Sequence, residues 1–329
     1  MKVLVTGGAG YIGSVTVAVL REAGFTVAVL DDLRTGHRAA VPEGVPLHAV
    51  SLADAGAVAA VLADGFDAVV HFAASSLVGE SVREPGRYWK NNVAGTLVLV
   101  EAAAAAGVRR FVFSSSAAVY GEPATVPIPE TAPLAPVNPY GRTKAAMEWL
   151  LADVAAAHGM TAVALRYFNA AGAWNGLGED HRPETHLIPR LLRSLLVPGE
   201  TFALYGDDYP TPDGTCIRDY IHVHDLAAAH AAALEADLPP GLTALNLGTG
   251  RGYSVREVVA AAARITGRPL DPPVRPRRPG DPARLVARPE RAADLLDWEP
   301  RRSDLETIVR DAWRWHSAHP AGYGPDGRG

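Results

Sequence analysis

Short apolar runs alternate with longer amphipathic segments through the first half of the chain. Runs of this kind are typical of strands in a parallel sheet, because both faces of such a sheet are covered. We expect six strands, at residues 3–5, 26–30, 47–51, 67–72, 111–115 and 161–165. Helices are expected between them, at residues 11–23, 55–62, 91–106 and 140–157. The alternation predicts an α/β fold with a Rossmann-type, doubly wound parallel sheet.

The texture changes after about residue 172, where loops lengthen and proline recurs. We therefore expect two parts: residues 1–172 as a nucleotide-binding domain, and residues 173–323 mainly as a smaller α/β C-terminal substrate lobe, with some segments returning to the first domain. Residues 324–329 are expected to form a disordered tail. The second lobe is expected to hold a strand, a helix and a loop rich in proline and arginine, at residues 244–247, 254–266 and 270–282.

A glycine-rich turn follows the first apolar run and opens the first helix. It contains Gly7, Gly10, Tyr11, Ile12 and Gly13. Glycines in this context let the backbone turn tightly and approach a pyrophosphate, which the helix N-terminus then stabilises. Asp31 and Asp32 end the second expected strand, where a carboxylate binds ribose hydroxyls and repels a 2′-phosphate. The sequence therefore predicts NAD as the cofactor in preference to NADP.

A tyrosine and a lysine stand four residues apart, at Tyr140 and Lys144, in a segment expected to be helical. Positions i and i+4 share a helix face, so the ammonium should lie beside the phenol. We expect this charge to lower the pKa of Tyr140 and make it a usable base near neutral pH. Ser116 follows the fifth expected strand and should hold the reacting alcohol on the same oxygen. The three side chains predict hydride chemistry on an alcohol.

Other strands are expected to end at the same edge of the sheet. Phe72, Ala73 and Ala74 follow the fourth strand, and Ser114 ends the fifth. Ligands of open α/β sheets bind outside the carboxyl ends of the strands, so these residues should border the cofactor.

Composition excludes several classes of protein. The chain has 329 residues, a formal net charge of -5 and one cysteine, Cys216. The charge offers nothing to attract nucleic acid or an anionic membrane, and one cysteine makes neither a disulfide framework nor a multi-cysteine metal site. With no signal-peptide pattern and no long apolar segment, we expect a cytoplasmic protein with no metal, nucleic-acid or membrane partner.

These motifs together resemble the extended short-chain dehydrogenase/reductase family and, within it, the UDP-glucose (UDP-galactose) 4-epimerases. The resemblance runs from residue 1 to about residue 323. Its specific stretches include the glycine turn, the Ser114–Ser116 run and Pro139-Tyr140-Gly141-Arg142-Thr143-Lys144. Further stretches lie at residues 78–82, 91–96, 166–169, 205–211, 218–223 and 246–250.

The resemblance implies reversible 4-epimerisation of UDP-glucose and UDP-galactose through a 4-keto sugar, with tightly bound NAD. It implies that Tyr140 takes the proton of the 4-hydroxyl, that Ser116 binds the same oxygen and that Lys144 holds the nicotinamide ribose. It also implies a homodimer formed through the helices at residues 92–106 and 140–157. Asn91 and Tyr167 are implied as further cofactor contacts. The implied substrate contacts, besides Ser116 and Tyr140, are Asn169, His186, Leu187, Tyr205, Arg218, Arg278, Asp281 and Leu285.

Three alternatives stay open. A nucleotide-sugar dehydratase or decarboxylase of the same fold would need an added acid–base pair after the serine run, where this chain has Ala117 and Ala118. An epimerase of another UDP-sugar (N-acetylglucosamine, glucuronate or arabinose) would share every motif above. A non-catalytic NAD-sensing regulator would be expected to lack the tyrosine or the lysine, and both are present.

Overall fold

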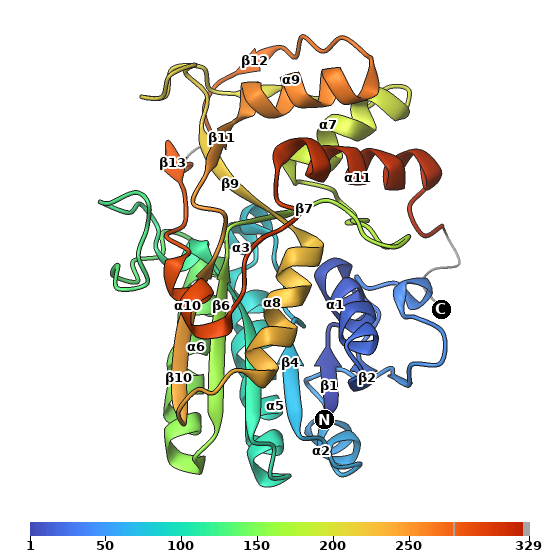
Figure 1. Ribbon diagram of the computed structural model, residues 1–329, viewed down its shortest axis with the longest axis vertical. Coiled ribbons are helices and arrows are strands. Elements are labelled where there is room, and N and C mark those ends of the chain that lie inside the picture. Colours follow the sequence, from blue (N-terminus) through green and yellow to red (C-terminus); the bar gives the residue numbers. More distant parts are fainter. Residues whose placement is uncertain (279, 325–329) are drawn as a thin grey trace.

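The computed structural model describes residues 1–278 and 280–324. Two parts are evident in Figure 1: a large sheet flanked by helices, and a smaller part beyond one end of its strands that contains α7, α9 and α11.

The large sheet has seven parallel strands in the order β10-β6-β5-β4-β1-β2-β3. They span Lys2–Thr6 (β1), Thr26–Leu30 (β2), Leu47–His48 (β3), Ala68–His71 (β4), Arg110–Ser116 (β5), Thr161–Tyr167 (β6) and Gly241–Leu247 (β10). Neighbouring side chains of a strand point to opposite faces: Val3 and Val5 join one apolar cluster, and Leu4 joins the other. The expected Rossmann-type sheet is therefore confirmed.

Helices cover both faces. On one face lie α1 (Tyr11–Glu22), α8 (Val223–Glu235) and α10 (Glu290–Leu296). On the other lie α2 (Ala55–Leu62), α5 (Gly95–Ala105) and α6 (Pro139–His158). The chain between β4 and α5 forms α3 (Val78–Arg83), α4 (Pro85–Tyr88) and the π-helix η2 (Trp89–Ala94); short 3-10 turns η1 and η3 span Arg38–Ala40 and Ala117–Val119.

The smaller part is built on β9 (Ile217–His222). This strand pairs with β7 (Asn169–Ala171), β11 (Gly252–Ser254) and β13 (Arg284–Leu285). Packed with this sheet are α7 (Leu187–Leu196), α9 (Val255–Thr266) and α11 (Leu305–Ala318), which share one apolar cluster. A separate pair joins β8 (Leu204–Tyr205) to β12 (Val274–Arg275).

Several expectations need correction. The strand expected at residues 244–247 in the second lobe is β10, an edge strand of the large sheet. The helix expected over residues 91–106 is π-helical up to Ala94 before it continues as α5. The segment expected as a loop at residues 270–282 contains β12. The tail expected at residues 324–329 lies, apart from Gly324, outside the described residues.

Candidate active site

The glycine turn between β1 and α1 is tightly enclosed by backbone. Gly7 has a φ of +72°, and a Cβ there would lie 2.6 Å from the amide nitrogen of Ala73. A Cβ on Gly13 would lie 2.1 Å from the carbonyl oxygen of Gly7. Only glycine fits at these two positions. The expected segment around Phe72 and Ala73 thus lies against the turn, and both border a cradle that fits a dinucleotide at the N-terminus of α1.

Asp31 lies at this turn too. It is buried, and its carboxylate accepts hydrogen bonds from the amides of Ala9 (3.0 Å) and Leu33 (2.9 Å). Burial raises its pKa, and the two amide bonds oppose that rise. Asp32 instead pairs with Arg34 at 2.6 Å, and Arg34 also donates to Asn91. With Arg34 engaged by an acid and an amide, the site fits an unphosphorylated ribose better than a 2′-phosphate.

Tyr140, Ser116 and Lys144 meet as the sequence predicts. Tyr140 enters in the first turn of α6, whose N-cap Asn138 accepts a hydrogen bond from the amide of Gly141. The Tyr140 side chain is hydrogen-bonded with Ser116, at the end of β5. The Nζ of Lys144 lies 5.9 Å from the centre of the Tyr140 ring and donates to the carbonyl oxygen of Ser114 at 2.7 Å.

The expectation that Lys144 lowers the pKa of Tyr140 is wrong for the protein without ligands. Burial raises the pKa of Tyr140, and the hydrogen bond with Ser116 only partly opposes that rise. Burial also lowers the pKa of Lys144 to about 7, while the charge of Glu148 acts in the opposite direction. The spacing of the two residues places them near each other, but desolvation is the largest influence on both pKa values.

A buried ion pair supports the lysine. Glu148 lies one further turn along α6, and its carboxylate accepts a hydrogen bond from Ser115 and a bidentate pair from Arg166 on β6. Arg166 also donates to the hydroxyl of Tyr120 at 2.7 Å. Because removing one partner would leave a buried charge unpaired, this network fixes α6 firmly against β5 and β6.

A second polar network fixes the other side of α6. Asn92, fully buried in η2, donates to the carbonyl of Ser75 (3.0 Å) and to the hydroxyl of Thr143 (3.1 Å). It accepts from the amide of Ser75, while Asn91 donates to the Ser75 hydroxyl. The π-helix thereby joins the loop after β4 to the helix of Tyr140. Sequence reasoning named Asn91 and missed Asn92, although it stands beside it.

Among the remaining cofactor candidates, Tyr167 and Phe72 both contact His230. Tyr167, at the end of β6, is hydrogen-bonded with Ser114 and, through its hydroxyl, with His230. The ring of Phe72 lies 4.7 Å from that of His230, so these side chains share one wall. The hydroxyl of Tyr11 donates to the carbonyl of Gly172. Ile12 lies in the first turn of α1, beside the glycine turn, and Ala74 follows β4.

Several of the candidate substrate-binding residues lie on or beside β9. Arg218 stands on β9, in register with Leu285 on β13, and lies 3.5 Å from the carboxylate of Asp281. Asn169 is in register with Tyr220, farther along the same strand. Asp219, which lies between Arg218 and Tyr220 on β9, is fully buried and accepts hydrogen bonds from Thr249, Gly250 and Ala287. That acid, which sequence reasoning missed, holds the neighbouring loops around Arg218.

The other substrate candidates lie on α7 and near β8. The Arg278 guanidinium stacks over the Tyr205 ring at 4.2 Å, and Tyr205 is also hydrogen-bonded with Arg190. Leu187 begins α7, and His186 is its N-cap residue. The Nδ1 of His186 points to Glu179 at 2.6 Å. Burial alone would lower the pKa of His186, but the charges and hydrogen bonds of Glu179 and Glu184 together outweigh it and raise that pKa well above its ordinary value.

A family model described as the NAD dependent epimerase/dehydratase family matches residues 3–248. The chain belongs to this family. The expected NAD cofactor and the resemblance to extended short-chain dehydrogenases/reductases are confirmed by this membership. Among the described residues, none of the helices combines the length and the apolar character needed to cross a membrane.

Known relatives match along nearly their whole length. A UDP-glucose 4-epimerase of Streptomyces lividans is 53% identical over 100% of this chain and 99% of its own. The UDP-glucose 4-epimerase of Brucella ovis, solved in complex with NAD, is 47% identical with a TM-score of 0.91 and covers 96% of this chain and 98% of its own. The enzyme of Bifidobacterium longum, in complex with NAD+ and UDP, is 38% identical with a TM-score of 0.93 and covers 98% and 100%.

The buried lysine predicts a pH-dependent stability. The pKa of Lys144 is about 7 in the folded chain and ~10.4 when unfolded. Between these values the unfolded chain binds more protons, so the free energy of unfolding should rise with pH, by at most ~1.4 kcal/mol per pH unit. Denaturant unfolding of the NAD-free protein and of Lys144→Met should therefore diverge across this window. Lys90→Met, which removes an exposed lysine, is the control. A constant difference between wild type and Lys144→Met would contradict the lowered pKa.

Proposed function

We propose that the protein interconverts UDP-glucose and UDP-galactose by reversible epimerisation at C4 of the sugar. The observation that carries the proposal is the hydrogen-bonded Tyr140–Ser116 pair beside the buried Lys144. The two hydroxyls can take a proton from a substrate alcohol and return it. The neighbouring dinucleotide cradle would hold the cofactor that an oxidation and reduction of this alcohol needs. The full-length similarity to UDP-glucose 4-epimerases supports this choice of substrate.

The roles of the side chains follow from their positions. Tyr140 takes the proton of the 4-hydroxyl and later returns it, while Ser116 binds the same oxygen throughout. Lys144 holds the nicotinamide ribose. A bound NAD would supply a hydride acceptor and then a hydride donor for C4, and its positive charge would favour the ionisation of Tyr140, whose pKa burial raises. Because the sugar is re-reduced from its other face, the site must release the ring and keep the nucleotide.

The diphosphate is the anchor in this scheme. Arg218 and Arg278 come from different segments of the smaller part, and arginine binds phosphate oxygens in bidentate geometry. Leu187 opens α7, so its free amide is available to an oxygen of the diphosphate. We assign Asn169, His186, Tyr205 and Asp281 to the same nucleotide. A tight grip on the diphosphate and a loose grip on the sugar let the site bind both epimers comparably.

The dehydratase alternative is disfavoured by the residues after Ser116. Ala117 and Ala118 form the turn η3, and neither bears a group that could move the protons of an elimination. Epimerisation of another UDP-sugar differs from our proposal only in the sugar pocket. The two-part division at about residue 172 and a cytoplasmic location remain predictions, which limited proteolysis and cell fractionation would test.

Replacing the proposed base tests the mechanism directly. Tyr140→Phe should lower kcat by ~10²–10⁴-fold and leave folding and NAD binding intact, because the ring keeps its packing. Turnover of UDP-galactose and NAD content at 340 nm after reduction are the two measurements. Tyr323→Phe removes another partly buried tyrosine hydroxyl, one bonded to the backbone of Gly178, and should keep near-normal turnover. Retention of more than a tenth of the wild-type rate by Tyr140→Phe would exclude this role.

Leu285 is the candidate gate for sugar size. It packs against the apolar cluster that contains Ala117, Val119 and Ile128, and Ala117 directly follows Ser116 in the chain. It therefore lies beside the segment that carries the catalytic serine. Since leucine is shorter than tyrosine, we propose a pocket that prefers glucose and galactose and admits the N-acetylated sugars at a lower rate.

Leu285→Tyr should narrow this pocket. We expect kcat/KM for UDP-N-acetylglucosamine to fall by ~10-fold or more relative to UDP-glucose, since one methylene is worth ~1–3 kcal/mol of discrimination. Leu285→Met, which roughly conserves volume, should keep the ratio of the two activities. An unchanged ratio in Leu285→Tyr would show that the gate lies elsewhere.

We also propose that two copies of the chain associate through α5 and α6. Large apolar side chains are exposed on or beside these helices: Trp149 on α6 is 59% exposed, and Leu97 on α5 and Trp89 in η2 are also exposed. Exposed large apolar side chains on neighbouring helices are typical of a protein–protein interface.

Trp149→Glu should disrupt this association, because a carboxylate would be desolvated in the interface. Sedimentation velocity should show a dimer for the wild type and a shift toward the monomer for the variant. Leu295→Glu, at an exposed apolar residue of α10, should leave the dimer unchanged. A monomeric wild type, or a fully dimeric Trp149→Glu, would contradict the proposed interface.

A further inference from the structure

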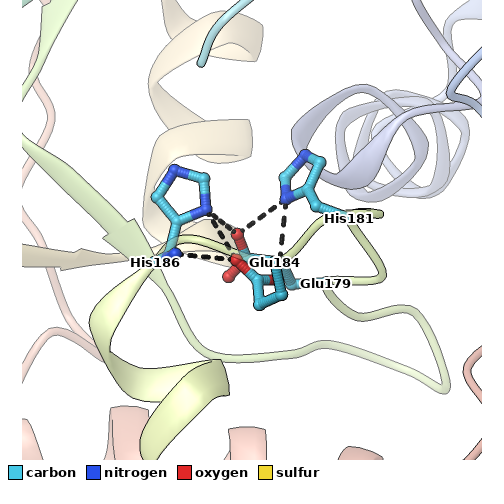
Figure 2. A group of neighbouring side chains, drawn as sticks. All are labelled: Glu179, His181, Glu184 and His186. Carbon is cyan, nitrogen blue, oxygen red and sulfur yellow. Dashed lines mark hydrogen bonds and ion pairs between the residues drawn. The ribbon is translucent and has the colours of Figure 1, made fainter. Parts of the chain in front are cut away.

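Four ligand-type side chains converge in the segment between β7 and α7. Glu179, His181, Glu184 and His186 come from eight consecutive residues, and one potential ligand atom of each lies within 4.8 Å of the others. Figure 2 shows the two imidazoles directed toward the two carboxylates from opposite sides. The hydride chemistry assigned above uses none of the first three.

The distances in this cluster suit a small cation. Nδ1 of His186 lies 2.6 Å from Glu179 and 3.2 Å from Glu184, and Nδ1 of His181 lies 2.9 Å and 3.9 Å from the same two carboxylates. In a tetrahedral site with metal–ligand bonds of ~2.0–2.1 Å, ligand atoms stand ~3.3 Å apart. The four separations lie on both sides of this value, so changes of up to ~0.7 Å in these distances would fit the cluster around an ion.

The charges favour a dication. The side chains of Glu179 and Glu184 are only 4% and 8% exposed, so two carboxylates are taken out of water next to each other. With neutral imidazoles, a divalent cation would balance the two negative charges of these carboxylates.

The cluster also has orienting partners and an access route. The amides of Thr185 and His186 both donate to Oε1 of Glu184 at 2.7 Å, which fixes that carboxylate. Such bonds around the ligands orient them for a metal. A cavity of ≈ 600 Å³, large enough to hold many waters, is lined by His181 and Glu184. Two arginines in its wall are already paired, Arg182 with Asp180 and Arg193 with Glu200.

We infer that Glu179, His181, Glu184 and His186 form a structural site for one divalent transition-metal ion, with Zn²⁺ as the best match. Two imidazole nitrogens and two carboxylate oxygens form a mixed donor set suited to Zn²⁺, whereas Mg²⁺ requires octahedral oxygen ligands. The ion would fix the conformation of residues 179–186, which lie between Tyr11 and the start of α7. Sequence reasoning expected no metal because one cysteine cannot form a multi-cysteine site, and it did not consider the Glu-x-His-x-x-Glu-x-His spacing.

Metal binding is measured without any sugar substrate, so the result is independent of the proposed function. Untagged full-length protein is dialysed against EDTA and titrated with ZnCl₂ by isothermal titration calorimetry near neutral pH. We expect one Zn²⁺ per chain, proton release, and a rise in Tm when ZnCl₂ is added. MgCl₂ at the same concentration should give no saturable signal.

Matched variants locate the ion. Glu179→Gln should weaken Zn²⁺ binding by at least ~10-fold, whereas Glu200→Gln, the same change in the wall of the same cavity, should bind as the wild type does. His181→Ala, at a more exposed ligand, gives the same test if Glu179→Gln does not fold, with near-UV circular dichroism as the check. Absence of saturable binding, or equal affinity in wild type, Glu179→Gln and His181→Ala, would show that the cluster is only an ion-pair network.

Discussion

The site depends on keeping an ammonium group in the protein interior. Lys144 is buried, and its Nζ has a carbonyl oxygen, that of Ser114, as hydrogen-bond partner. An isolated charge in such a place would be neutralised by a shift of its pKa. Glu148, one turn away, opposes that shift but is itself committed to Arg166. The balance leaves the lysine close to its titration point at neutral pH, where the charge brought by a bound dinucleotide or the ionisation of Tyr140 determines its state.

This constraint explains why α6 is held from two sides. The Glu148–Arg166 pair fixes it to β5 and β6, and Asn92 fixes Thr143 to the loop after β4. Neither network includes a residue that we propose to bind the sugar. Both set the direction in which Tyr140 and Lys144 point, so a small rotation of the helix would separate the phenol from Ser116. A π-helix that supplies Asn92 is consistent with this role, since π-helical turns occur frequently at functional sites.

Sequence reasoning succeeded where the signal is local. Buried parallel strands are uninterrupted apolar runs, so β1, β2, β4, β5 and β6 were found to within two residues, and the glycine turn identified the cofactor edge. It failed where the outcome depends on the surroundings. The pattern of β10 predicts a strand but not the sheet that it joins, and Pro189 in the first turn of α7 made a helix resemble a loop, although proline is tolerated there. The pKa of Tyr140 depends on burial, which the spacing of Tyr140 and Lys144 does not report.

The exchange of segments between the two parts of the molecule has a mechanical consequence. β9, which carries Arg218, continues without a loop into α8, and α8 packs on the same face of the large sheet as α1, the helix that follows the glycine turn. β10 then completes the large sheet and leads into the loop that Asp219 holds through Thr249 and Gly250. The arginine proposed for the diphosphate is therefore connected to the cofactor cradle by continuous, packed elements. Since the proposed reaction turns the sugar over while the nucleotide stays in place, a rigid connection here, with freedom confined to the sugar pocket, is the arrangement that the chemistry requires.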